Sequence, residues 1–168
     1  MRREAIPTWE ELEEHSKSVP EINPAAVIAM LGIKQAAEEI QESIMDILKN
    51  QYQLSEGRFC ALIVLHQNAN GIAPSVLAEK IGVTRATVST LVQRLERDGF
   101  LTVVSDESDG RGKKLRLTKA GRDFMASILP PHYLRISKLM GRLSRDEQKE
   151  LIRLLSKLSE PEIEQKIV

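Results

Sequence analysis

One stretch near the middle of the chain restricts the possible folds more than any other. Two segments with helical spacing, residues 74–81 and 84–98, are separated only by a Gly-Val pair. Two short apolar runs, residues 101–104 and 114–118, follow on either side of a polar loop that contains glycine. A helix, a tight turn, a second helix and a hairpin in this order predict a winged helix-turn-helix.

The segment before this motif is predicted to be one long helix. Asn23 followed by Pro24 is typical of a helix start, because asparagine caps a helix and proline fits its first turn. Apolar residues then recur at alternating spacings of three and four, at Met30, Ile33, Ala37, Ile40, Ile44 and Ile47. Such a narrow seam packs against another helix, supplied either by the same domain or by a second copy of the chain.

Capping boxes mark further helices at both ends of the chain. Thr8 with Glu11 predicts a short helix over residues 9–16, for which a frayed acidic tail is the alternative. Ser144 with Glu147 predicts a last helix in the same way.

A helix is also expected directly after the second apolar run. Thr118 caps it, and Pro130 and Pro131 are expected to break or kink it before the helical spacing resumes. These carboxyl-terminal helices carry few unusual polar residues, so we interpret them as dimer or core elements.

Composition narrows the class of protein. No apolar run among the 168 residues approaches the roughly 20 that a membrane span needs, and the amino terminus lacks the apolar core of a signal peptide, so we expect a cytoplasmic protein. Cys60 is the one cysteine and lies in an apolar run, which favours a core position over a redox-sensing thiol. The three histidines lack the spacing of metal ligands, so neither a metal nor another cofactor is expected.

Charge is unevenly distributed along the chain, although its net value is zero. Residues 1–56 carry 5 basic and 11 acidic side chains, whereas residues 72–122 carry 10 basic and 6 acidic ones. The basic excess therefore coincides with the predicted winged motif, where a phosphate-binding surface would need it.

The second helix of the motif has two contrasting faces. Val88, Leu91, Val92 and Leu95 fall within a narrow inward arc. The opposite face is small and polar in its first turns and basic in its last, which suits a DNA major groove, although a merely solvated face is the alternative. The residues predicted to contact DNA from this helix are Arg85, Ala86, Thr87, Ser89, Thr90, Gln93, Arg94 and Arg97.

The hairpin adds a second basic group. Arg111, Lys113, Lys114 and Arg116 lie in or just after the polar loop, a form that can reach an adjacent minor groove or the sugar-phosphate backbone. Asp109 precedes Arg111 by two residues and would orient its guanidinium through a charge-assisted hydrogen bond. The wing residues predicted at the DNA are therefore Asp109, Arg111, Lys113 and Lys114.

Several short sequence motifs occur along the chain. Each is common by itself, but their order and spacing together are specific. They are Leu-Ala-Glu-Lys-Ile-Gly-Val at 77–83, Thr-Val-Ser at 87–89, the run at 91–101, Asp-Gly-Arg at 109–111 and Leu-Thr-Lys-Ala-Gly at 117–121. With this spacing, over about 100 residues, the chain resembles the MarR family of bacterial transcriptional regulators.

The resemblance implies a mainly α-helical fold with a small β-wing. Residues 54–118 would form the winged helix-turn-helix that binds DNA. Residues 23–53 and 119–168 would form a helical dimerisation region, and residues 1–22 an acidic extension with a short helix.

The resemblance also implies a function. Members of the family are obligate homodimers that bind a pseudo-palindromic double-stranded DNA operator, usually repress nearby genes and release DNA when a small ligand or oxidant arrives. Aromatic and phenolic compounds are frequent effectors. By position, Arg111 would enter the minor groove with Asp109 as its supporting carboxylate.

The chain departs from the family pattern at three places. It has Val103 and Val104 where a basic pair is common, and Gly110 where a second basic residue is common, so fewer backbone contacts are expected from the wing. The redox-sensing branch carries its cysteine near the start of the first long helix, where Cys60 does not lie. Release by a ligand is therefore expected, rather than release by thiol oxidation.

Two other classes of function were weighed against DNA binding. A winged-helix module that binds protein and has lost DNA contact is the main alternative, supported by the zero net charge. An enzyme is not expected, because no nucleophile-base pair, paired catalytic carboxylates, glycine-rich phosphate loop or metal cluster is recognisable, and no catalytic residue is assigned.

The wing assignment makes a direct prediction. Arg111→Ala should weaken binding to the operator at least tenfold, because a guanidinium inserted beside phosphates contributes strongly to affinity. Gel-shift titration measures the loss, and circular dichroism confirms that the dimer stays folded. Unchanged affinity would contradict the assignment.

Overall fold

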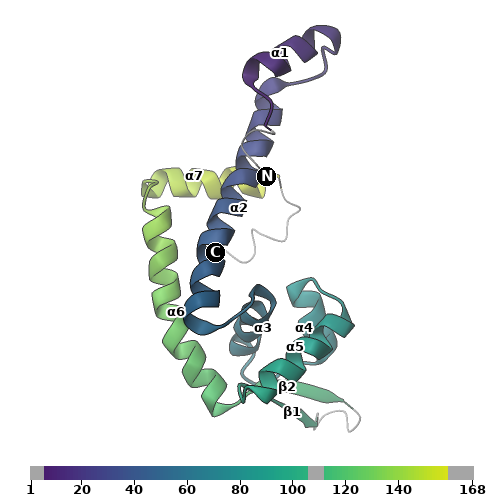
Figure 1. The fold of residues 1–168 in the computed structure, drawn as a ribbon, viewed down its shortest axis with the longest axis vertical. Helices are drawn as coiled ribbons and strands as arrows, with labels where there is room; N and C mark the ends of the chain where they lie inside the picture. The colour runs from purple at the N-terminus through teal and green to yellow at the C-terminus, as the bar shows by residue number, and fades with distance from the viewer. Residues whose placement is uncertain (1–5, 106–111, 159–168) are drawn as a thin grey trace. The chain divides into compact units, whose positions relative to one another are not determined.

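The structure is a computed structural model that describes residues 6–105 and 112–158. Figure 1 shows its helices and the two-stranded sheet. In chain order the elements are α1 (Trp9–Ser18), α2 (Pro24–Tyr52), α3 (Glu56–Gln67), α4 (Pro74–Ile81), α5 (Arg85–Arg97), β1 (Leu101–Ser105), β2 (Lys113–Leu117), α6 (Lys119–Met140) and α7 (Arg145–Ser156). The expected mainly α-helical fold with a small β-wing is confirmed.

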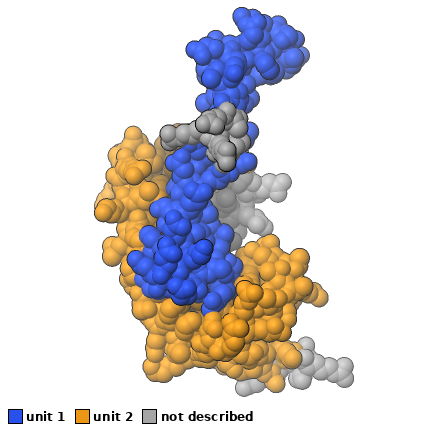
Figure 2. Space-filling model, in the orientation of Figure 1, with its two compact units in different colours: residues 1–61 blue, residues 62–168 orange. Residues whose placement is uncertain are grey.

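The chain forms two compact units, which have different colours in Figure 2. The first is Met1–Ala61 and the second is Leu62–Val168. Helix α3 begins in the first unit and ends in the second.

Helix α1 starts at the predicted capping box. The Thr8 hydroxyl accepts a hydrogen bond from the Glu11 amide at 3.2 Å, and the Glu11 carboxylate accepts one from the Thr8 amide at 2.7 Å. The helix packs on α2 with Leu12 buried, whereas Trp9 is 48% exposed and donates its indole N–H to Glu13. The predicted short helix is therefore formed, with Leu12 covered and Trp9 largely open to solvent.

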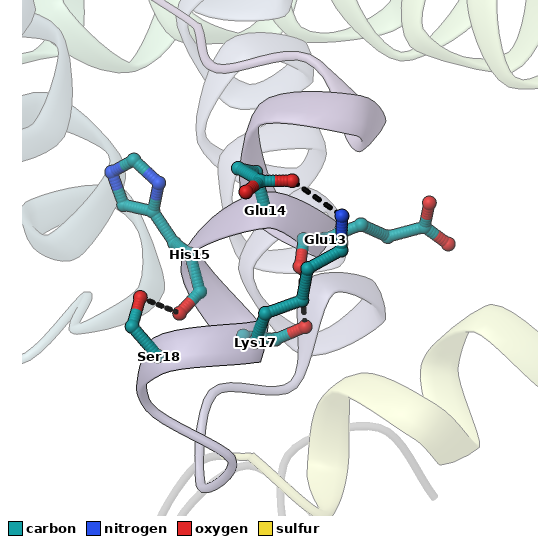
Figure 3. A network of polar contacts seen from close by, with 6 residues as sticks. Glu13, Glu14, His15, Lys17 and Ser18 are labelled. Atoms are coloured by element: carbon teal, nitrogen blue, oxygen red, sulfur yellow. Dashed lines mark hydrogen bonds and ion pairs between the residues drawn. The ribbon is translucent and has the colours of Figure 1, made fainter.

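Short-range polar contacts link neighbouring turns of α1 (Figure 3). The Lys17 ammonium pairs with the Glu14 carboxylate one turn away, and the Ser18 hydroxyl donates to the His15 carbonyl. Because both residues of the ion pair are mostly exposed, this pair contributes little to stability.

Helix α2 begins as the sequence predicts. The Asn23 side chain accepts a hydrogen bond from the Ala26 amide at 3.2 Å, and Pro24 occupies the first turn. Leu48 is fully buried, but Met30 and Ile33 in the predicted seam remain 55% and 42% exposed. The first half of the seam is thus left open by a single copy of the chain.

The second unit is built around the helix-turn-helix and the hairpin. Helix α4 packs against α5 and β2, α5 against β1, and α6 against β2. The strands are antiparallel, with Val103 opposite Leu115. The largest fully buried side chains of this unit are Leu62, Leu65, Leu77, Val88, Leu95, Leu101, Leu115, Met125 and Ile128.

Ile72 adds a third short segment to the sheet, which sequence reasoning did not anticipate. Its amide donates to the Leu115 carbonyl at 3.2 Å, and the Leu115 amide donates back to the Ile72 carbonyl at 2.8 Å. This isolated antiparallel bridge lies on the edge of β2 opposite β1. It connects the loop before α4 directly to the wing.

Helix α6 differs from expectation at its prolines. It runs without interruption from Lys119 to Met140 and includes Pro130 and Pro131, so the expected break is wrong, whereas the alternative of a kink stays a prediction. The fixed φ of proline is compatible with a helix, and the local cost is the loss of two N–H donors to the Ala126 and Ser127 carbonyls. Burial of Met125, Ile128 and Leu129 on one side holds the helix together across this site.

Helix α7 has the predicted capping box and an open apolar side. The Ser144 amide donates to the Glu147 carboxylate at 2.7 Å, and hydrogen bonds from Ser144 hold the pKa of that carboxyl below its usual range. No residue of α7 is buried; Ile152 and Leu154 are 42% and 45% exposed, and Leu158 just beyond the helix is 74% exposed. Neighbouring exposed apolar side chains of this kind are typical of a surface that a partner covers.

The start of α6 packs very closely on the turn that follows α5. A Cβ atom added at Gly121 would lie 2.1 Å from the Phe100 carbonyl oxygen, so only glycine fits there. The Thr118 hydroxyl donates to the Gly99 carbonyl at 2.6 Å, and the rings of Phe100 and Phe124 stack with centroids 4.4 Å apart. We name these contacts the α5–α6 junction.

Two glycine substitutions test this packing. Gly121→Ala should destabilise the protein by about 1–3 kcal/mol or more, because the new methyl group would overlap a backbone oxygen. Gly32→Ala in α2 should instead stabilise it by about 0.5–1 kcal/mol, because nothing lies within 4 Å of the added Cβ and alanine favours a helix. Urea unfolding gives both values, and equal effects would contradict the junction.

Candidate nucleic-acid interface

The position of α5 is set by the turn that precedes it. Gly82 ends α4 in the left-handed region, with φ of 67°, and the Val83 amide donates back to the Ala78 carbonyl. Thr84 then caps α5 by accepting a hydrogen bond from the Thr87 amide at 3.2 Å. α4 ends and α5 begins within three residues. The left-handed turn at Gly82 and the cap at Thr84 therefore fix the angle between the two helices.

One face of α5 is buried as the helical wheel predicts. Val88, Leu91 and Leu95 are 1%, 8% and 0% exposed, and Val92 is half-buried. Burial of this face against α4 and β1 leaves the opposite face in solvent.

The opposite face contains every residue that the sequence places at the DNA on this helix. All of them are exposed: Arg85, Ala86, Thr87, Ser89, Thr90, Gln93, Arg94 and Arg97. The structure therefore brings them together on one accessible surface, which we name the α5 face.

Hydrogen bonds divide the polar residues of the α5 face into two groups. The Thr87 hydroxyl lies 2.9 Å from that of Thr84, and the Thr90 hydroxyl donates to the Ala86 carbonyl at 3.3 Å, so both are engaged with their own helix. Within the described parts of the chain, no side-chain hydrogen bond or ion pair involves Arg85, Ser89, Gln93 or Arg94. These four side chains are the ones best able to meet a partner. The engagement of the two threonines was not evident from the sequence.

The wing is only partly described. Asp109, Gly110 and Arg111 lie outside the described residues, so their predicted roles stay predictions. Lys113 is exposed opposite Ser105, and Lys114 is half-buried opposite Val104. Because side chains alternate along a strand, these two lysines lie on opposite faces of the sheet.

The remaining reactive side chains lack the surroundings of a chemical site. Burial raises the pKa of the half-exposed Cys60 thiol, and the Glu56 carboxylate raises it further, which disfavours the reactive thiolate at neutral pH. Burial lowers the pKa of His132, and the Arg135 charge lowers it further, so both favour the neutral ring. Within residues 6–105 and 112–158 no cluster of potential metal ligands occurs. No helix in those ranges has the length and apolar character of a membrane span.

Comparison with known proteins shows which family the winged segment resembles. The model of the MarR family matches residues 52–112, which extend from the end of α2 through α3, α4, α5 and β1. Over these residues the chain is similar to the MarR family. The match covers the helix-turn-helix that carries the α5 face.

Three further proteins are similar to the chain over most of its length. The chain is 27% identical to the Bacillus subtilis protein described as HTH-type transcriptional repressor YetL, over 95% of this chain and 96% of the relative. Its fold is shared with S. aureus MepR, solved in a complex with DNA, at 22% identity and a TM-score of 0.65, over 75% of this chain and 91% of MepR. NadR in complex with 4-hydroxyphenylacetate is similar at 24% identity and a TM-score of 0.63, over 79% and 92% of the two chains.

Proposed function

We propose that the chain is a sequence-specific DNA-binding transcriptional regulator that acts as a homodimer on a pseudo-palindromic operator and represses nearby genes. The observation that carries the proposal is the α5 face, an exposed set of small, polar and basic side chains on the second helix of a helix-turn-helix. The YetL relative is described as a transcriptional repressor, and MepR of the same fold has been solved with DNA. Both support this reading.

Each part of the α5 face has a distinct task in this proposal. Ser89 and Gln93 are short, unengaged polar groups that read base edges in the major groove, together with Arg85. Arg94 and Arg97 lie in the last turn and contact phosphates, with further attraction from the wing. The engaged hydroxyls of Thr87 and Thr90 leave these residues to contact DNA through their methyl groups.

A second copy of the chain completes the regulator. The open apolar residues of α7 and the open half of the α2 seam are surfaces that a symmetric partner would cover. Two recognition helices related by a two-fold axis then enter successive major grooves about 34 Å apart. The operator half-sites follow this spacing.

Release by a small aromatic or phenolic ligand completes the proposed cycle. NadR of the same fold has been solved with 4-hydroxyphenylacetate, which supports an effector of this class. A ligand that binds more tightly to dimers with altered helix spacing shifts the population away from the DNA-bound form. The raised pKa of Cys60 favours this route over oxidation of the thiol.

Binding by variants of three exposed residues tests the proposal. A DNA site is first selected from a random pool, and affinities for that site and for random DNA are measured by gel shift. Gln93→Ala should weaken binding to the selected site about tenfold or more but leave random DNA unaffected, because one base contact is lost. Arg94→Ala should weaken both, and Lys149→Ala on α7 should change neither.

Wild-type protein without affinity for any DNA at low salt would overturn the proposal. That result would favour a winged-helix module that binds protein. Equal losses from Arg94→Ala and Lys149→Ala would show that charge alone, and not the α5 face, attracts DNA.

A further inference from the structure

Gly71 occupies a sharp turn between α3 and α4 that is fixed on both sides. Its φ of 86° lies in the left-handed region that favours glycine, and its amide donates to the Asn68 carbonyl at 2.8 Å. The next residue, Ile72, makes the two hydrogen bonds with Leu115 described above. Residue 71 is therefore held directly against the edge of β2.

The side chain of Arg116 lies across this glycine. A Cβ atom added at Gly71 would lie 2.5 Å from Arg116 Cγ and 3.3 Å from Arg116 Cδ. It would also lie 3.0 Å from the Leu115 carbonyl oxygen. The aliphatic part of the Arg116 side chain therefore packs on Gly71, which has no Cβ atom. Any other residue at position 71 would displace the arginine side chain.

Arg116 lies on the outer face of the wing. It is opposite Thr102 and is exposed, whereas its strand neighbours Leu115 and Leu117 are buried. Lys114 shares its face, because side chains of a strand alternate. Within residues 6–105 and 112–158, Arg116 makes no ion pair with a carboxylate, so its charge is not neutralised there.

We propose that Arg116 is a phosphate-binding residue of the wing strand and that Gly71 is its positioning residue, a role that rests on the proposed DNA-binding function. The loop before the helix-turn-helix would then set the direction of a wing side chain. A guanidinium whose stem is held in place loses less conformational freedom when it binds, and its planar fork suits phosphate oxygens. Arg116 would contact the sugar-phosphate backbone of DNA, so this contact adds affinity for DNA of any sequence.

The salt dependence of binding tests the Arg116 contact. The slope of log affinity against log salt is measured for wild type, Arg116→Ala and Arg116→Lys, on the selected site and on random DNA. Arg116→Ala should reduce the magnitude of the slope by about 0.9 for each protomer, because one phosphate contact is lost. Both DNAs should lose affinity by a similar factor, and Arg116→Lys should restore the slope but only part of the affinity.

A double-mutant cycle tests the role of Gly71. Gly71→Ala should lower the slope as Arg116→Ala does, but should have no further effect on the slope when Arg116 is already alanine. Gly71→Asn is the second variant, because asparagine tolerates a positive φ while its Cβ still displaces the arginine. Thermal melts followed by circular dichroism show that each variant is folded.

Two results would overturn the inference without affecting the proposed function. An unchanged slope for Arg116→Ala would mean that Arg116 only covers Gly71. An equal effect of Gly71→Asn in the presence and absence of the Arg116 side chain would mean that Gly71 acts on the fold alone. Failure of the proposed function is distinguishable, because wild type and Lys149→Ala would then bind no DNA.

Discussion

The contact between Gly121 and the Phe100 carbonyl is the constraint on which the arrangement of the second unit depends. It brings the first turn of α6 against the turn that follows α5, at a distance that excludes any Cβ atom. Thr118 and the stacked ring of Phe124 secure the same point. Because the start of α6 packs directly on this turn, a displacement of α6 would also move the turn at the end of the proposed recognition helix.

Exposure of the α5 face follows from how α5 is stabilised. Val88, Leu91 and Leu95 are buried against neighbouring elements, so the helix does not need its other side for stability. The exposed side can therefore carry residues that contact a partner, such as Ser89 and Gln93. Net charge of the whole chain is a poor guide here, because the acidic amino-terminal segment hides the basic excess of the winged motif.

The sequence predicted what local chemistry determines. The caps at Thr8, Asn23, Thr118 and Ser144 each start a helix where expected, because a side-chain oxygen near free amides is a local signal. It did not predict the bridge between Ile72 and Leu115 or the packing of the Arg116 side chain on Gly71, because both contacts join residues far apart in the chain. The break at Pro130 was wrong, because tertiary burial of α6 outweighs the lost hydrogen bonds. Of the predicted site, the α5 face is seen on one surface, whereas Asp109 and Arg111 lie outside the described residues.

Disulfide cross-linking to DNA tests the central claim, that the α5 face meets the major groove, most directly. Cys60 is the one cysteine, so Cys60→Ser gives a background in which Ser89→Cys places a single thiol on the α5 face. We predict efficient cross-linking of that thiol to a base of the selected site that carries a thiol tether in the major groove. Lys149→Cys on α7 should cross-link poorly in the same background. Equal yields from the two positions would contradict the account.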